Sequence, residues 1–153
     1  MTDPLDARIT TLEDRRAIED LRYTYWLAIV ERDLETMLSC YSPDSRSEFG
    51  FGYEINGHEE TRAFYAERFA DQALKVQVPF GSNGLLKLVD DSHAEGAWLI
   101  QVSIVHHDKP LGVRNHVRYH ERYAKLDGAW KIAYQRTEYL FFEKFTLSDS
   151  PLP

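Results

Sequence analysis

Hydrophobic and polar residues alternate in two long segments between Val113 and Phe142, which are joined by Asp127-Gly128. An alternation with a period of two is typical of β-strands, because successive side chains leave opposite faces of a sheet. Asp-Gly between two such runs is a strong signal for a two-residue hairpin turn. The pattern therefore predicts a long antiparallel hairpin, and long antiparallel strands make a curved sheet that can enclose a ligand.

The two faces of this predicted hairpin differ in chemistry. One row is largely apolar: Val113, Val117, Tyr119 and Tyr123, continued on the second strand by Trp130, Ile132 and Tyr134. The other row is basic: Arg114, His116, Arg118, His120 and Arg122. We expect the apolar row to face a core or cavity and the basic row to face solvent or a subunit. A register slip of one residue would exchange the two faces, and the basic row would then form a cationic wall of the cavity.

The first half of the chain shows helical spacing. Thr10 and Glu13 predict a capping box at the start of a long amphipathic helix, with an inner face of Ala17, Ile18, Leu21, Tyr25, Ala28 and Ile29. Asp33 is expected to cap a short second helix that Pro43 ends. A third helix is predicted from His58 to Leu74, after an Asn56-Gly57 turn.

Strands are predicted at Ser45–Phe51, at Leu85–Val89 after a turn at Gly81–Gly84, and at Gly96–Val105. Helices that precede a meander of strands are typical of an α+β fold, in which helices gather on one face of an antiparallel sheet. The sequence contains no low-complexity linker, so we expect one domain over residues 1–145 and a loose tail over 146–153.

Composition excludes several classes of protein. The 153 residues carry a formal net charge of −7, whereas a nucleic-acid interface needs concentrated positive charge. No apolar run approaches the roughly 20 residues of a membrane span, and the acidic N-terminus has no apolar segment of a secretory signal. Cys40 is the single cysteine, so no internal disulfide can form. These features predict a cytoplasmic protein with no nucleic-acid or membrane partner.

Three motifs resemble a known family. They are Ala17-Ile18-Glu19-Asp20-Leu21 followed by Tyr25, Cys40-Tyr41-Ser42-Pro43-Asp44, and the hairpin sequence from Arg122 to Ile132, RYAKLDGAWKI. Together they are similar to the SnoaL-like family of the nuclear-transport-factor-two-like superfamily, and most of all to its scytalone dehydratase and bile-acid dehydratase branch. The resemblance implies a cone-shaped sheet with the N-terminal helices on its concave face, enclosing a pocket.

The resemblance also suggests roles for individual residues. Tyr25 matches a tyrosine that activates the substrate in the dehydratase branch, Phe49 stands where that branch has another tyrosine, and Tyr139 stands where the bile-acid dehydratases have a substrate-binding arginine. The sequence departs from the branch as well. The usual histidine is missing from Gln77–Asn83, Val30 replaces an acidic residue, and Trp98 occupies the place of a second histidine. The family mechanism therefore does not transfer intact, and the resemblance implies no metal and no cofactor.

Polar residues on the apolar face add further candidates, because a polar side chain that points inward must be paired or contact a ligand. Asn115 and Tyr119 are candidate ligand contacts, together with the amide of Asn83. Glu121 has two interpretations. It either pairs with Arg122, Arg136 or Lys125, which we favour, or burial raises its pKa so that it acts as a base. His106-His107-Asp108 could suggest a metal site, but adjacent side chains of a strand diverge.

The sequence thus predicts an enzyme: a cofactor-independent lyase, dehydratase-like, or an isomerase for a hydrophobic, ring-containing substrate, aromatic or polycyclic. The predicted catalytic residues are Tyr25 and Glu121. The predicted substrate contacts are Phe49, Asn83, Trp98, Asn115, Tyr119 and Tyr139, and no metal site is expected. The alternative is a non-catalytic protein, resembling the β subunits of ring-hydroxylating dioxygenases or binding a small molecule. We expect a homo-oligomer, because one core does not need all of Tyr23, Trp26, Phe141, Phe142 and Phe145. The family resemblance favours a trimer, with a dimer as the alternative.

Overall fold

The computed structural model describes residues 4–107 and 110–147, except for the side chain of Asn83. The helices are α1 (Pro4–Glu31), α2 (Leu34–Ser39) and α3 (Gly57–Ala70). The strands are β1 (Tyr41–Gly50), β2 (Tyr53–Asn56), β3 (Leu74–Leu88), β4 (His93–His106), β5 (Leu111–Leu126) and β6 (Ala129–Thr146). This is the predicted α+β order, with one further strand, β2, that the sequence pattern did not indicate.

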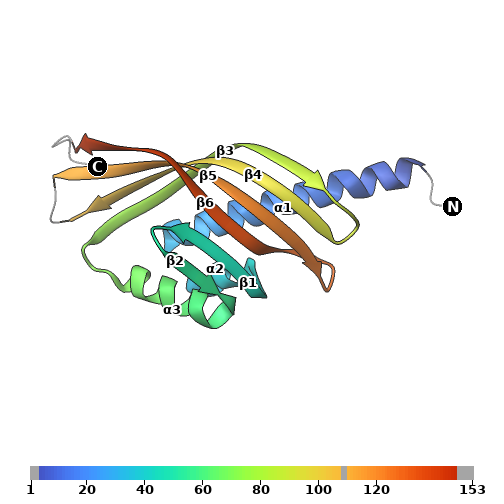
Figure 1. Ribbon diagram of the computed structural model, residues 1–153, viewed down its shortest axis with the longest axis horizontal. Coiled ribbons are helices and arrows are strands. Elements are labelled where there is room, and N and C mark those ends of the chain that lie inside the picture. The colour runs from blue at the N-terminus through green and yellow to red at the C-terminus, as the bar shows by residue number, and fades with distance from the viewer. Residues whose placement is uncertain (1–3, 108–109, 148–153) are drawn as a thin grey trace.

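All six strands form a single curved sheet in the order β2-β1-β6-β5-β4-β3 (Figure 1). Neighbouring strands are antiparallel except for β1 and β6, which are parallel, so the sheet is mixed rather than fully antiparallel. The helix α1 runs along the concave face against β3 and β6, and α3 packs on β1 and β2. The hydrophobic core lies between these layers and includes Ile18, Ile29, Ile100, Val117 and Ile132.

The helix ends follow local chemistry, although not always at the predicted residues. Pro4 begins α1, where its fixed φ suits the first helical position, so Thr10 lies inside the helix and the predicted capping box is wrong. Asp33 caps α2 as predicted and accepts a 3.0 Å hydrogen bond from the Thr36 amide. The helix α2 ends at Ser39, and Pro43 lies within β1, before the pairing with β2 starts at Arg46. The pairing of β1 with β6 is also irregular between Tyr41 and Arg46. A proline is tolerated in this stretch because its missing N–H interrupts few hydrogen bonds between strands.

The glycine-rich segment Gly81–Gly84 is not a turn. It lies within β3, where the pairing with β4 shifts between Ser82 and Leu85. A Cβ atom on Gly81 would lie 2.2 Å from the ring of Trp26, and one on Gly84 would lie 2.2 Å from the ring of Trp98. These glycines are therefore needed because two indole rings of the core pack directly on the strand backbone.

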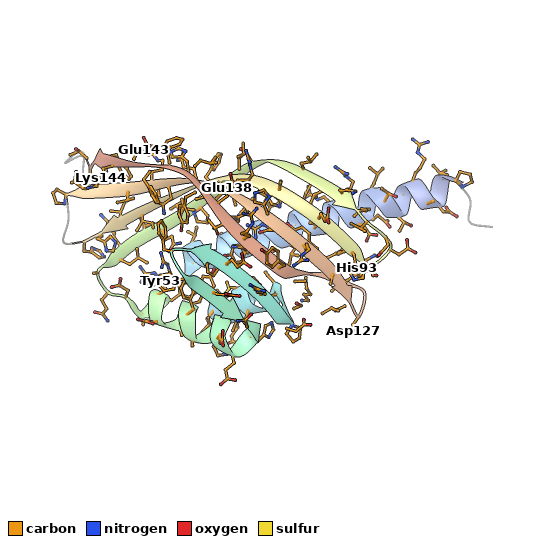
Figure 2. The ribbon with its side chains drawn as sticks, in the orientation of Figure 1. Tyr53, His93, Asp127, Glu138, Glu143 and Lys144 are labelled. Atoms are coloured by element: carbon orange, nitrogen blue, oxygen red, sulfur yellow. The ribbon has the colours of Figure 1, made fainter. Side chains whose placement is uncertain are left out.

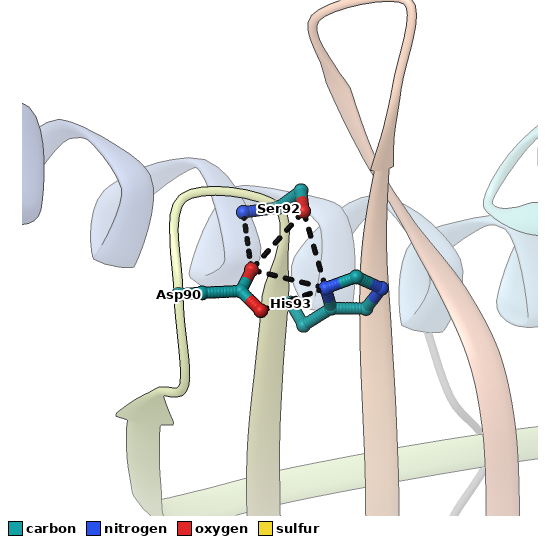
Figure 3. A network of polar contacts seen from close by, with 3 residues as sticks. All are labelled: Asp90, Ser92 and His93. Atoms are coloured by element: carbon teal, nitrogen blue, oxygen red, sulfur yellow. Dashed lines mark hydrogen bonds and ion pairs between the residues drawn. The ribbon is translucent and has the colours of Figure 1, made fainter.

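The turn between β3 and β4 is closed by the side chain of Asp90 (Figure 3). One of its oxygens accepts hydrogen bonds from the backbone amide of Ser92 at 2.8 Å and from its hydroxyl at 3.0 Å. His93 Nδ1 lies 3.0 Å from each carboxylate oxygen. These bonds lower the pKa of Asp90 to about 2, and the amide of Ser92 contributes most. The predicted polar turn is thus confirmed.

The hairpin of β5 and β6 has the predicted turn, with positive φ at Asp127 (50°) and Gly128 (79°). Val117 and Tyr123 are buried, so the apolar row faces inward as predicted and the alternative register is wrong. The basic row lies on the opposite face, where it forms ion pairs with Glu138 and Glu143 of β6. Figure 2 labels these two glutamates on β6. Glu143 contacts Arg114 and His116, and Glu138 contacts Arg118 and His120.

Tyr134 was predicted to belong to the inner row, but it lies on the outer face. Tyr123 pairs with Ile132 but Arg122 pairs with Tyr134, so β6 has a bulge at Ala133. A bulge adds one residue and reverses the alternation of side chains beyond it. Tyr134 therefore lies on the outer face beneath Arg122, whose guanidinium is 4.3 Å from the ring centroid, and Gln135 is buried instead.

The aromatic residues that suggested a homo-oligomer divide into two groups. Trp26 belongs to the core, with 7% of its surface exposed, and Phe145 is partly buried. Tyr23, Phe141 and Phe142 are about half exposed. The oligomeric state stays a prediction.

Candidate functional site

A cavity of about 100 Å³ lies between α1, α3 and the concave face of the sheet. Its aromatic lining comes from both helices and from three strands: Tyr25, Phe49, Phe64, Tyr65, Tyr119 and Tyr139. Aliphatic side chains, among them Ile29, Val102 and Ile104, complete the apolar wall. The helical spacing of α1 and the strand alternation of β5 and β6 both turn these residues toward the same space.

Two tyrosine hydroxyls meet in the wall of this cavity. The Tyr25 oxygen on α1 lies 2.7 Å from the Tyr65 oxygen on α3, and both residues are at least 96% buried. Burial raises the pKa of Tyr65, and its interaction with Tyr25 raises it further, so Tyr65 stays protonated at neutral pH. Because one hydroxyl donates to the other, the accepting one keeps its own proton for a further partner. The pair is thus suited to donate a hydrogen bond into the cavity.

A third tyrosine holds Tyr25 in place. The ring of Tyr41 meets the ring of Tyr25 edge to face, with centroids 5.7 Å apart. The Tyr41 hydroxyl donates to the side-chain oxygen of Gln135 at 3.2 Å, and the Tyr41 carbonyl lies 2.9 Å from His58 Nε2. These contacts fix the wall behind Tyr25.

The remaining polar lining of the cavity consists of Asn115, Thr137, Gln77 and Arg68. Asn115 and Thr137 project from β5 and β6, and the Thr137 hydroxyl has no hydrogen-bond partner among the described residues. Arg68 on α3 donates from Nε to the Gln77 side-chain oxygen on β3 at 3.0 Å. Within the described lining, Arg68 is the one charged residue.

Beside the cavity lies a fully buried ion pair. Arg22 Nη1 on α1 is 3.0 Å from Glu121 Oε1 on β5, and neither side chain is exposed. The two atoms are close but not aligned as a hydrogen bond, and Nε and Nη2 of Arg22 have no hydrogen-bond partner in the described part of the chain. The guanidinium instead packs on aromatic rings, 4.6 Å from the Tyr25 centroid and 4.8 Å from that of Trp26. Arg22 thus supports the back of Tyr25.

Glu121 has a second partner in this network. The Tyr123 hydroxyl donates to its other oxygen, and Trp98 Nε1 donates to the Tyr123 hydroxyl at 2.8 Å. Burial raises the pKa of Glu121, which the charge of Arg22 and the hydrogen bond from Tyr123 oppose. Burial also lowers the pKa of Arg22 and is the largest single effect, but the charge of Glu121 and the interactions with three nearby tyrosines together outweigh it, so the net shift is upward.

The structure brings most of the predicted site residues together. Five of them line the cavity: Tyr25, Phe49, Asn115, Tyr119 and Tyr139. Trp98 and Glu121 do not reach its wall and belong to the buried network behind it. The side chain of Asn83 lies outside the described residues. Glu121 has an ion-pair partner, as favoured, but the partner is Arg22 and not Arg122, Arg136 or Lys125.

Sequence reasoning missed three residues of this region. Arg22 follows Ile18 by four positions and precedes Tyr25 and Ile29 by three and seven, which is the spacing of the buried face of α1. Arg68 lies four positions after Phe64 and three after Tyr65, so it shares the inner side of α3 with both. Helical spacing could have indicated all three, had polar residues been scored together with apolar ones.

Two general findings concern the described residues. No group of three or more His, Cys, Asp or Glu side chains gathers in that part of the chain. Asp108 of the His106-His107-Asp108 sequence lies outside the described residues. No described helix has a stretch that is long and apolar enough to cross a lipid bilayer.

A curved sheet whose concave face and helices enclose an aromatic cavity defines the cone-shaped class of α+β proteins. The SnoaL-like domain family matches residues 10–136, and the chain belongs to this family. No curated protein matches the sequence.

Solved structures show the same fold at low sequence identity. A scytalone dehydratase-like protein of Novosphingobium aromaticivorans is 15% identical over 92% of this chain and 93% of that one, with a TM-score of 0.84. The hexachlorocyclohexane dehydrochlorinase LinA type 2 is 16% identical over 95% and 98%, also with a TM-score of 0.84. LinA type 3 of Novosphingobium barchaimii is 16% identical over 95% and 99%, with a TM-score of 0.83. At such identities the similarity establishes the fold alone.

Proposed function

We propose that this protein is a cofactor-independent lyase of dehydratase-like type, or an isomerase, which acts on a small hydrophobic molecule that contains a ring. The observation that carries the proposal is the pair of buried hydroxyls on Tyr25 and Tyr65, 2.7 Å apart in an aromatic cavity. Dehydration and dehydrochlorination, the activities for which the similar proteins are named, both remove a proton and a leaving group from neighbouring carbons.

The hydroxyl pair would act on the carbonyl or phenol oxygen of the substrate. In a dehydration, a proton next to the carbonyl and the hydroxyl group on the following carbon leave together as water. The electrons of the broken C–H bond form the new C=C bond. Negative charge develops on the carbonyl oxygen during the reaction, and a preorganised donor in a water-poor site stabilises such charge. In an isomerisation the same negative charge would develop while the proton passes from one carbon to another, and the described lining holds no aspartate, glutamate or histidine to carry it.

The surroundings of Glu121 support a structural role over the role of a base. Its carboxylate faces Arg22 and accepts a hydrogen bond from Tyr123, and it lies behind the cavity wall. The proposal therefore keeps Tyr25 as a catalytic residue, adds Tyr65 as its partner, and assigns Glu121 to the positioning of α1 against β5.

One observation favours a second candidate function, a non-catalytic protein that binds the same kind of molecule. None of the described residues that line the cavity is an aspartate, a glutamate or a histidine, and these are the side chains that most often act as general bases. A binding protein would use the aromatic walls and the tyrosine hydroxyls for recognition alone.

Replacing Tyr25 by phenylalanine tests the proposal. The substitution keeps the ring contact with Tyr41 and removes one donor, and the loss of one oxyanion donor lowers kcat by about 10²–10³. Wild-type protein would be incubated with ring-containing β-hydroxy ketones, and the conjugated C=C bond of the product would be followed by its ultraviolet absorbance. We expect turnover to fall more than tenfold in Tyr25→Phe.

Tyr23→Phe is the matched control, because Tyr23 lies on the same helix with 48% of its surface exposed. It should keep wild-type turnover. Undiminished turnover in Tyr25→Phe would remove Tyr25 from the mechanism. Wild-type protein that binds such ketones without converting any of them would favour the binding function instead.

A further inference from the structure

A second, wider hollow adjoins the cavity. This vestibule has a volume of about 440 Å³ and shares four residues with the inner cavity: Phe49, Phe64, Arg68 and Tyr139. We call these four residues the collar. Any ligand that reaches the tyrosine hydroxyls from the vestibule must pass between the three rings and the one guanidinium of the collar.

The three rings of the collar are held in place by close packing. The rings of Phe49 and Phe64 stack with centroids 5.3 Å apart and planes 11° from parallel. On the opposite side, Tyr139 packs so close to β1 that a Cβ atom on Gly50 would lie 2.9 Å from its ring. Gly50 also has a φ of +80°, a conformation that favours glycine. The end of β1 is thereby shaped to leave room for Tyr139.

Arg68 is held at the collar with part of its guanidinium uncommitted. Its Nε donates to Gln77, and its central carbon lies 5.9 Å from the Phe64 centroid. The two terminal nitrogens have no ion pair or hydrogen bond within the described part of the chain. An arginine presents such nitrogens as a planar fork that matches the two oxygens of a carboxylate.

The two volumes limit the size of what binds. A cavity of about 150 Å³ lined by apolar side chains holds one benzene molecule. The inner cavity of about 100 Å³ therefore accepts at most a single ring, and larger polycyclic systems do not fit without leaving part of their mass in the vestibule. The ring would fill the inner cavity against the tyrosine hydroxyls of its wall, and an attached group would lie at the collar.

The charged residues of the vestibule limit the charge of the substrate group that can lie there. Glu67 and Asp71 both line it, and both are exposed. With Arg68 the vestibule carries one positive and two negative charges, so it offers a site for a single carboxylate beside Arg68 but repels a chain of phosphates. A coenzyme A or nucleotide conjugate would place several negative charges against these two carboxylates.

We propose that the collar selects substrates with one ring and one free carboxylate, which Arg68 binds at the entrance to the cavity. This inference names the substrate class of the proposed function and rests on it for the direction in which the substrate lies. It does not depend on turnover, so binding can be measured apart from catalysis.

Benzoate and benzamide are suitable probes, because they have the same shape and differ in charge. Their affinities for the purified protein would be measured by titration followed by NMR. We expect wild-type protein to bind benzoate about tenfold more tightly than benzamide, since a charged hydrogen bond is about twice as strong as a neutral one. Arg68→Gln should bring benzoate down to the affinity of benzamide and leave benzamide unchanged, and Arg68→Lys should retain part of the preference.

Arg62→Gln is the matched control, because Arg62 lies on the same helix and pairs with Glu35 away from the collar. It should keep the wild-type preference. Benzoyl coenzyme A should bind more weakly than benzoate. Equal affinities for benzoate and benzamide, a preference that survives in Arg68→Gln, or tighter binding of benzoyl coenzyme A would each overturn the proposal. The loss of turnover in Tyr25→Phe would stand unaffected by any of these results.

Discussion

The buried pair of Arg22 and Glu121 offers a sharp test of how α1 is held against the sheet. Both side chains are fully buried, and their charged atoms lie 3.0 Å apart. At an effective dielectric constant of about 20, two unit charges at this distance attract by about 5–6 kcal/mol. Most of this attraction offsets the cost of removing both charges from water, so the pair itself contributes little net stability.

Removing one partner has a far larger effect than the pair's net contribution. Glu121→Gln keeps the shape of the side chain and leaves the Arg22 charge buried without a counterion. Breaking a buried pair in this way costs about 3–5 kcal/mol. For a domain of this size about 1 kcal/mol corresponds to roughly 2–4 °C in Tm, so we expect Tm to fall by about 6–20 °C.

Urea denaturation of the wild type and three variants measures these effects: Glu121→Gln, Arg22→Met, and the double variant Arg22→Met/Glu121→Leu. Both single variants should lose several kcal/mol of unfolding free energy. The double variant should recover most of the loss, because it buries no charge. As a control, Arg16→Met removes the exposed ion pair with Asp20 on the same helix, and exposed pairs contribute little. A loss below about 1 kcal/mol in Glu121→Gln would refute this account of the pair.

Two further predictions concern the C-terminal part of β3 and the turn that follows it. Gly84→Ala would place a Cβ atom 2.2 Å from the Trp98 ring. Such overpacking should lower the unfolding free energy by about 1–3 kcal/mol and alter the near-ultraviolet circular dichroism of tryptophan. The control Leu85→Ala, at a neighbouring exposed position, should change neither quantity. Asp90→Asn should lower Tm at neutral pH. Because the pKa of Asp90 is lowered to about 2 in the folded protein, its contribution is complete above the unfolded value of about 3.9 and disappears as the pH falls through about 2. The difference in Tm between wild type and Asp90→Asn should therefore shrink between pH 4 and pH 2. A difference that grows in acid would contradict this role of Asp90. An equal fall of Tm in the control Asp91→Asn would contradict it as well.

The sequence was most informative where one local rule determined the outcome. Alternation and the Asp127-Gly128 turn predicted the hairpin and its buried face, and Asp33 predicted the start of α2. Helical spacing likewise turned Tyr25 into the cavity. In each case the determining residues lie within a few positions of one another, so a short segment of sequence is enough to predict the local structure.

Other features depend on residues that are distant in the chain. The glycines at 81 and 84 have the composition of a turn, but they are required by Trp26 and Trp98, which reach them from α1 and β4. Glu121 pairs with Arg22, which lies about a hundred positions earlier, so no local spacing could select it over nearer cations. The bulge at Ala133 leaves no local signal either, and it alone moved Tyr134 to the outer face.

The parallel pairing of β1 with β6 has a consequence for how the protein is made. Translation delivers β1 and α3 long before β6, so the wall that contains Phe49 stays open to water until the last strand has left the ribosome. Tyr139 can then complete the collar only in the final stage of folding. A nascent chain that stalls within β6 would display an unfinished aromatic surface, which is what chaperones and quality-control proteases recognise.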